Sequence, residues 1–595
     1  MTLSFFDWAV IAAYFLFNLG IGIYYARRAS GSTSEFFLSG RDVPWWLAGT
    51  SMVATTFAAD TPLAVTGFVA KNGIAGNWLW WNFVMSGMMT VFFYARLWRR
   101  AGVMTDIEFA ELRYSGKPAA FLRGFRALYL GLPINCIILG WVNLAMIKIL
   151  EVTLGVDKKQ AIYIVIGILI FTAFYTTISG LWGVLVTDLF QFVLKMGMVI
   201  LLAILAVKSV GGIDAMKMKI AELDATSGQQ GSRLAFFPEW DSVWMPAITL
   251  FTYLAVNWWA SWYPGAEPGG GGYVAQRIFS AKDERHGLLA TLWFNIAHYA
   301  LRPWPWILTA LASLILYPTL EDKEAGYIKT LLDPNVFPTY LRGFMLAAFA
   351  AAYMSTIGTQ LNWGASYVIN DFYRRFVKKD GNERHYVIIS QLVTLLLMVV
   401  SLIVTFYLDS IGKAWKVLLV TGAGTGTVLL LRWFWWRINA WSEVSAMIAA
   451  ALCSIVLQLG FNMDSDQPKD FAYLMLITVA FTTVVWVVVT FLTPAEPMEK
   501  LVHFYRKVRP DGAGWKPVAA QAGIVDTNLG GGLAIQFLNW FVGCVLIYAF
   551  LFGIGYVILG SLIKGLLLLA VGIIAWVIIS RNLQRANWKA VGDEA

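Results

Sequence analysis

The chain has 595 residues, of which 58% are hydrophobic and only 14% charged. Soluble globular domains carry about 25% charged residues, so this composition excludes an ordinary soluble protein and predicts a polytopic membrane protein. The net charge of +9 does not indicate nucleic-acid binding, because the basic residues lie in short runs between apolar segments. The three cysteines, Cys136, Cys453 and Cys544, lack paired spacing, so neither a disulfide framework nor a thiol metal site is predicted.

Apolar runs long enough to cross a bilayer recur along the whole chain. The first is followed, not preceded, by Arg27 and Arg28, which indicates a retained helix rather than a signal peptide. The sequence predicts fifteen transmembrane helices, near residues 5–25, 45–71, 74–98, 119–150, 160–179, 183–207, 244–267, 286–317, 340–372, 386–410, 414–434, 441–461, 470–493, 534–559 and 562–580.

The charges between these runs predict the orientation of the chain. With the N-terminus outside, basic runs such as 374–379 and 506–509 fall on the cytoplasmic side and the acidic run 321–324 falls outside. The C-terminus is then cytoplasmic, and we expect a plasma membrane location, bacterial inner membrane in particular. Two longer loops are predicted, outside at 208–243 and inside at 494–533. We favour a plain connector over a short amphipathic surface helix for the first.

The helix predicted at 45–71 is interrupted in its middle. Small and hydroxyl residues crowd between Ser51 and Thr61, and Asp60 precedes Pro62 by two positions. Proline removes a backbone donor, and unwound backbone at membrane depth is tolerated where it lines a cavity, so this break is a candidate ion and solute site. An intramembrane carboxylate such as Asp60 indicates function by default, although it could instead cap the half-helix that restarts after the break.

A second interruption follows the helix that begins near 244. The stretch from Tyr263 to Tyr273 holds four consecutive glycines, which disfavour a regular helix. Each interrupted helix is the first of a set of five predicted transmembrane helices. Because five is odd, the second set begins on the opposite side of the membrane from the first, as in inverted-repeat transporters. The predicted organisation is an N-terminal extra helix with its inside loop (1–44), a first five-helix repeat (45–207), the outside loop (208–243), a second five-helix repeat (244–434) and C-terminal extra helices (435–595).

Three further groups carry candidate chemistry. Ser355 and Thr356 offer two adjacent hydroxyl groups. If the backbone carbonyls near Ala54 and Phe57 face them, these oxygens together would form a hard ligand shell for a monovalent ion. The alternative is that the two hydroxyls only bond back to their own helix or allow close helix packing. Asp188 either draws a cation toward the cytoplasm or is an interfacial acid. His298 and Arg302, four apart on one helix face, either contact solute or hold helices together. The other histidines lie at inside loops, which argues against a zinc cluster in the membrane.

Several stretches in this order and spacing resemble the sodium:solute symporter family over about residues 5–461. They are Gly40-Arg41, Ser51 to Thr61, Ile178-Ser179-Gly180-Leu181, Asp188 to Gln191, Gln276-Arg277, and Met354-Ser355-Thr356 through Asn362 and Asp371. The resemblance implies an all-α polytopic membrane protein with the leucine-transporter-type five-plus-five inverted repeat and extra flanking helices.

The resemblance also implies particular site residues. Sodium would bind the carbonyls of Ala54, Phe57 and Ala352 and the hydroxyls of Ser355 and Thr356. Asp188 would line the sodium exit or a second sodium site, although Ala352 stands where members with that site carry another hydroxyl. The solute would lie between the broken helices, beside Thr56, Asp60, Thr61, Trp262, Tyr263, Glu267 and His298.

The predicted function is sodium-coupled import of a small polar organic solute. A sugar or polyol is slightly favoured, and an amino acid, amine or carboxylate is the alternative solute. A proton-coupled carrier and a non-transporting solute sensor are the alternatives, whereas a channel or an intramembrane enzyme lacks the expected residues. The predicted partners are the solute, Na⁺ and the lipid bilayer, with no organic cofactor. The identity of the solute and the oligomeric state stay open at this stage.

Overall fold

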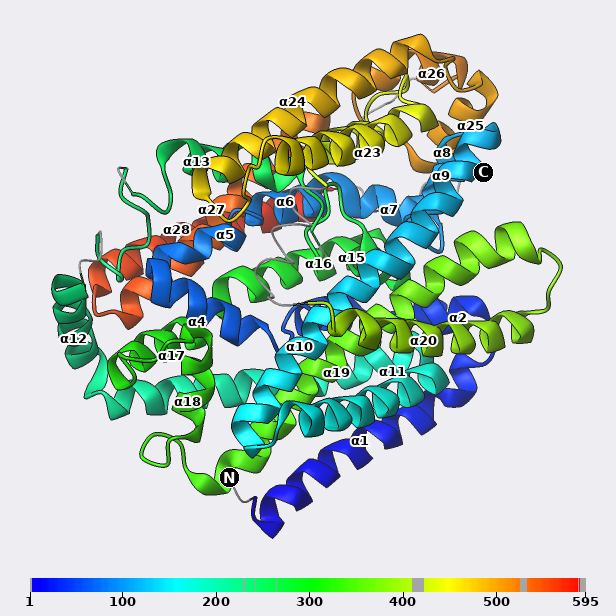
Figure 1. The fold of residues 1–595 in the computed structure, drawn as a ribbon. Coiled ribbons are helices and arrows are strands. Elements are labelled where there is room, and N and C mark those ends of the chain that lie inside the picture. Colours follow the sequence, from blue (N-terminus) through cyan, green and yellow to red (C-terminus); the bar gives the residue numbers. More distant parts are fainter. Residues whose placement is uncertain are drawn as a thin grey trace.

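The computed structural model describes residues 3–227, 231–240, 242–263, 265–408, 422–524, 532–586 and 588. Within this part of the chain the fold is all-helical, and its one β-type contact is an isolated bridge between Val43 and Ala281. Figure 1 shows α23 and α24 along one edge of the molecule and α1 along the opposite edge.

Nine helical segments of the described residues are long and apolar enough to cross a membrane. They are α1 (Phe5–Ala29), α9 with α10 (Gly116–Leu154), α11 (Lys158–Ser209), the segment around α19 (Thr339–Val377), α20 (Glu383–Thr405), the α23 segment (Ala440–Gly460), α24 (Pro468–Leu492), α27 (Gly532–Ile558) and α28 (Leu562–Arg585). Large apolar side chains on α1, α20 and α28 are exposed, as expected of surfaces that face lipid.

Shorter helices make up the rest. They are α2 (Thr33–Leu38), α3 (Trp45–Thr55), α4 (Thr61–Asn72), α5 (Trp78–Trp81), α6 (Val84–Met89), α7 (Ala95–Ala101), α8 (Phe109–Arg113), α12 (Gly212–Ser227), α13 (Ala247–Thr252), α14 (Trp258–Ala260), α15 (Gly272–Ser280), α16 (Glu284–Asn295), α17 (Pro303–Leu316), α18 (Gly326–Leu332), α22 (Thr425–Leu431), α25 (Met498–Val508) and α26 (Lys516–Gln521).

Both predicted interruptions are confirmed. Helix α3 ends at Thr55 and α4 begins at Thr61, with Pro62 in its first turn, where a missing N–H costs nothing. On the other side, α14 ends at Ala260 and α15 begins only at Gly272. Gly269, Gly270 and Gly272 have positive φ, which explains why the glycine run cannot continue a helix.

Other predicted segments differ from the structure. The run 74–98 is not one regular helix: a turn at 82–83 separates α5 from α6, and the π-helical segment Thr90–Tyr94 joins α6 to α7. The two helices predicted at 160–179 and 183–207 both lie within α11, where they meet at a kink at Gly180. The connector favoured within 208–243 is wrong, because α12 is a helix of 16 residues. Residues 414–421 of the helix predicted at 414–434 lie outside the described residues, and the remainder contains α22. Part of the loop 494–533 also lies outside them, and the loop elsewhere contains α25 and α26.

The first broken helix lies at the centre of the packing. Helix α3 packs against α11, α16 and α19, and α4 packs against α17. Every α3 residue from Leu47 to Thr55 is buried. Gly49 permits the close approach of α16, since a Cβ there would lie 2.5 Å from the carbonyl oxygen of Ala290. The carbonyls freed at the end of α3 therefore face other helices and not lipid.

Candidate solute and cation site

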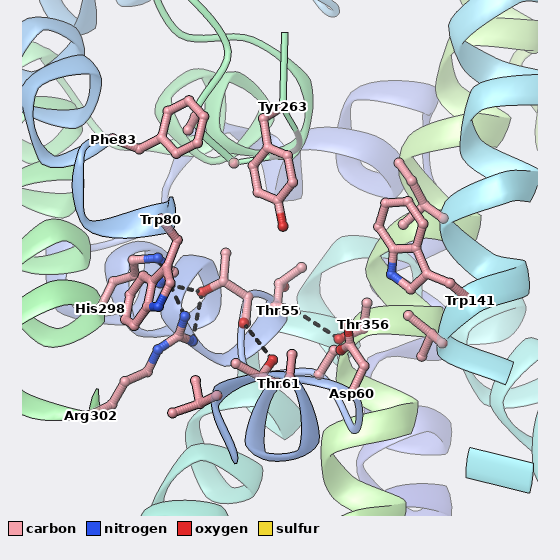
Figure 2. Close-up of a pocket in the computed structure, with 18 of the residues that line it drawn as sticks. Thr55, Asp60, Thr61, Trp80, Phe83, Trp141, Tyr263, His298, Arg302 and Thr356 are labelled. Carbon is pink, nitrogen blue, oxygen red and sulfur yellow. Dashed lines mark hydrogen bonds between the residues drawn. The ribbon is translucent and has the colours of Figure 1, made fainter. Parts of the chain in front are cut away.

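A pocket lies against the break between α3 and α4 (Figure 2). Of the seven side chains predicted to contact solute, the structure brings five to this pocket: Thr56, Asp60, Thr61, Tyr263 and His298. Aromatic rings from other elements complete its wall: Trp80, Phe83, Trp141, Tyr273 and Tyr299. The pocket thus joins both interrupted regions, with apolar ring faces around a few polar groups, as is typical of small-molecule sites.

One side of the pocket is a hydrogen-bonded cluster of Arg302, His298 and Thr56 (Figure 2). The Arg302 guanidinium donates to Thr56 Oγ1 over 3.0 Å and lies 3.3 Å from His298 Nε2. Because arginine only donates, Nε2 must accept, and the other ring nitrogen, Nδ1, then donates to Thr56 Oγ1 over 3.0 Å. The cluster therefore holds a buried cation and a neutral imidazole in one orientation beside the pocket.

Asp60 lies at the base of the pocket and is 2% exposed. Its Oδ1 has no hydrogen-bond partner among the described residues. Asp60 is the residue before α4, but its side chain makes no cap hydrogen bond to that helix, so the structure gives no support to the alternative of Asp60 as a structural cap. A buried acceptor without a partner is costly unless a ligand supplies one.

The carbonyls predicted to bind sodium are already engaged. Lys195, on α11, donates through Nζ to the carbonyl oxygens of Ala54 over 2.8 Å and Phe57 over 3.2 Å. The Lys195 side chain is buried, with 1% exposed. In this arrangement the two carbonyl oxygens already bind the ammonium group of Lys195, so they do not fit the binding of an additional Na⁺.

The hydroxyls predicted as sodium ligands lie beside the same break. Thr356, on α19, donates to the carbonyl oxygen of Thr55 over 2.8 Å and lies 3.3 Å from that of Ala352. Ser355 donates to Asp188 over 2.6 Å. The structure therefore gathers the five predicted ligands around α3, but their polar atoms bond to protein groups.

Asp188 is fully buried between four helices, so the interpretation as an interfacial acid is wrong. Its second oxygen accepts a hydrogen bond from Ser51 over 2.5 Å, and the Arg277 guanidinium lies 3.9 Å from the same oxygen. Arg277 also donates to Ser51 and to Thr359 on α19. Asp188 is thus the anionic centre of a network that joins α3, α11, α15 and α19.

Two predicted solute contacts do not line the pocket. Trp262 lies on a separate groove, with Phe125 and Val444. Glu267 lines a small cavity of its own, and its Oε2 accepts the backbone N–H of Gly265. Glu267 lies in the glycine-rich stretch and Trp262 directly before it, and the local path of the chain there was not predictable from the sequence.

Sequence reasoning gave Lys195 no role, and it considered Arg302 only together with His298, as a solute contact or a link between helices. A signal existed for both, because each is an ionisable residue inside an apolar run, and such residues indicate a functional site by default. Lys195 also lies seven residues after Asp188, which places the two on the same face of α11. The wall residues Trp80 and Trp141 carried no such signal, since aromatic residues are frequent throughout the chain.

A buried pocket between interrupted helices in a bundle of membrane-spanning helices defines a polytopic membrane transporter rather than an enzyme. The model of the sodium:solute symporter family matches residues 36–450. This chain belongs to that family, a family of multi-pass membrane proteins that use Na⁺ as the coupling ion and imply no cofactor.

Curated relatives and a solved structure are similar over most of their length. The sodium/glucose cotransporter of Vibrio parahaemolyticus is 24% identical over 511 residues, covering 81% of this chain and 90% of the relative. The sodium/proline symporter of Staphylococcus aureus strain JH9 is 25% identical over 474 residues, covering 75% and 85%. The solved structure of a Na⁺-coupled sialic acid symporter, in a substrate-bound outward-open state, matches with a TM-score of 0.65 and 19% sequence identity. The match covers 83% of this chain and 99% of that structure. That likeness shows the fold.

Proposed function

We propose that this chain is a secondary active symporter that imports a small polar organic solute by alternating access, with Na⁺ as the coupling ion of its family. The observation that carries the proposal is the pocket between the two helix interruptions, where Asp60 has an acceptor atom without a partner. Binding at such a midpoint site lets a carrier expose one solute to either side in turn.

Within this proposal the solute is a sugar or polyol. The pocket wall is made largely of aromatic rings, whose faces cover the C–H faces of a sugar ring, while Asp60, Thr61 and Gln360 offer acceptors and donors for hydroxyl groups. Asp60 would accept a hydrogen bond from a solute hydroxyl.

A zwitterionic amino acid is the second candidate, favoured by the opposite charges at the pocket. Asp60 would pair with the amino group, and the Arg302 guanidinium would attract the carboxylate. The relatives named for glucose and for proline belong to these two solute classes. Their solutes are properties of those proteins, so the choice must come from this chain's own pocket.

A thermal-shift screen of the purified chain in constant Na⁺ would identify the solute. The panel holds sugars, polyols, amino acids and amines, because a ligand of the folded state raises its melting temperature by mass action. The hit is then supplied to vesicles containing the chain, with and without an inward Na⁺ gradient. Concentrative uptake supports the proposal, whereas specific binding without flux refutes it and leaves a solute sensor.

The proposal also includes the architecture and location expected of the chain. Residues 45–207 and 244–434 would form the two inverted repeats, and Asp188 would line the sodium exit. The N-terminus would lie outside and the C-terminus in the cytoplasm, in the plasma membrane. The two interruptions and the position of Asp188 beside α3 support this arrangement.

A further inference from the structure

Lys195 is a cation placed at the carbonyls that the family resemblance assigns to sodium. Its Nζ bonds the carbonyl oxygens of Ala54 and Phe57 and lies 5.1 Å from the centre of the Phe57 ring. Helix α3 ends at Thr55, so the Ala54 carbonyl lies in its last turn, where partial negative charge gathers, and the Phe57 carbonyl lies in the break just after it. An ammonium group carries the unit charge of Na⁺ and satisfies oxygen acceptors with its three donors.

The surroundings of Lys195 also oppose a second cation. Arg277 is buried beside Asp188, and Arg302 is buried with its guanidinium 3.3 Å from the carbonyl oxygen of Val53, in the last turn of α3. Asp188 is the anion of the network that joins α3, α11, α15 and α19, and both of its oxygens already accept hydrogen bonds, from Ser51 and Ser355. A Na⁺ ion on the same carbonyls would lie within a few ångströms of the ammonium group, in a region shielded from water, where like charges repel strongly.

We infer that the ammonium group of Lys195 occupies the position of the family's sodium ion, and that Lys195 and Na⁺ exclude each other at the carbonyls of Ala54 and Phe57. The lysine is a tethered cation: it holds the end of α3 in place as a bound ion would, but it cannot leave the protein. This inference rests on the proposed function, because it concerns how the same carrier fills its cation site. Na⁺ can reach these carbonyls only after the Lys195 side chain has moved away.

The test is a sodium titration of purified full-length chain without solute, at fixed pH, with choline chloride holding ionic strength constant. Melting temperature is the readout. We expect little or no saturable stabilisation of the wild-type chain by Na⁺. Lys195→Met removes the charge and keeps an unbranched side chain, and we expect it to lower the Na⁺ concentration for half-maximal stabilisation at least about tenfold. Lys208→Met, the same change at an exposed position of α11, is the matched control and should behave as wild type.

Two further variants protect the test against a misfolded mutant. Lys195→Gln keeps a donor for the carbonyls without the charge and should gain the same sodium response, whereas Lys195→Arg keeps the charge and should not. A Lys195→Met protein that folds only when purified in Na⁺ supports the inference as well. An unchanged or weaker sodium response in the neutral variants overturns it.

The wild-type chain supplies an independent outcome. Tight, saturable stabilisation by Na⁺ that Thr356→Ala abolishes would place sodium at this site with Lys195 present, and would overturn the inference without any lysine variant. Because the titration contains no solute, its result is separate from the proposed function, which fails instead when vesicles containing the wild-type chain take up no solute.

Discussion

At the scale of single residues, two buried carboxylates beside the same helix have opposite surroundings. Asp188 accepts hydrogen bonds from Ser51 and Ser355 and lies close to Arg277, whereas Asp60 has an oxygen without a partner and caps nothing. A carboxylate satisfied by the protein stabilises the fold, and one left unsatisfied is available to a ligand. The two should therefore respond differently to the same substitution.

Asp60→Asn should weaken solute binding by roughly ten- to hundredfold, because a hydrogen bond to a charged group contributes about 1.5–3 kcal/mol. The melting temperature without solute should stay within about a degree or two of wild type, since the side chain holds no helix end. Calorimetric titration with the solute from the screen measures the first quantity and a thermal scan the second. Asp214→Asn, at an exposed side chain, is the control. A clear fall in melting temperature with solute affinity intact would assign Asp60 to the fold.

Asp188→Asn should instead destabilise the protein. The change keeps the shape of the side chain but leaves the buried cations Arg277 and Lys195 without their anion, and breaking a buried charge network in this way costs about 3–5 kcal/mol. We expect a lower melting temperature and less folded protein in the membrane. If Asp188→Asn melts like wild type and only turns over more slowly, Asp188 serves the exit of an ion and not the structure.

At the scale of elements, both interruptions and the division of α11 near Gly180 were predictable, whereas the backbone geometry of the kink was not. Pro62 and the glycine run are local signals that can be recognised in the sequence alone. The turn at 82–83, the π-helical segment Thr90–Tyr94 and the close approach at the kink of α11 depend on packing against neighbours, which hydropathy does not record. Gly180 has φ 56° and ψ −154° and sits against α2, where a Cβ would lie 2.7 Å from the carbonyl oxygen of Phe36.

Gly180→Ala should therefore destabilise the chain by about 1–3 kcal/mol, the cost of a non-glycine residue in this backbone region. The close contact with α2 adds to that cost. Gly197→Ala on the same helix is the matched control, because a Cβ there meets nothing within 4 Å and alanine favours the helix. Thermal scans of both variants in the same detergent decide the matter; equal melting temperatures would show that α11 can straighten at Gly180.

At the scale of the whole molecule, the family and the membrane class were predicted from the sequence, and five of the seven residues predicted to contact solute line the pocket. The occupant of the cation site did not. The resemblance identified Ala54, Phe57, Ser355 and Thr356 as neighbours, but it could not reveal that a side chain from α11 reaches the carbonyls of Ala54 and Phe57. Which atoms fill a site is decided by three-dimensional packing, so a motif predicts the shape of a site better than its contents.

The predicted orientation can be checked with single cysteines at Lys323 and Lys379, in a chain whose Cys136, Cys453 and Cys544 are replaced by alanine. A membrane-impermeant maleimide added to intact cells should label Lys323→Cys, because its loop is predicted outside. It should label Lys379→Cys only after the cells are opened. Labelling in the reverse pattern would invert the proposed topology.

The tethered ammonium group has an energetic consequence for accumulation. Each sodium ion that crosses with solute releases about 2.3 kcal/mol at 100 mV, enough to concentrate a neutral solute about fiftyfold. A cycle completed with Lys195 still on its carbonyls carries no ion through that site and leaves the membrane potential unused there. Such a cycle only equilibrates solute across the bilayer. The fraction of cycles in which Lys195 withdraws would then set how steep a solute gradient the cell can maintain.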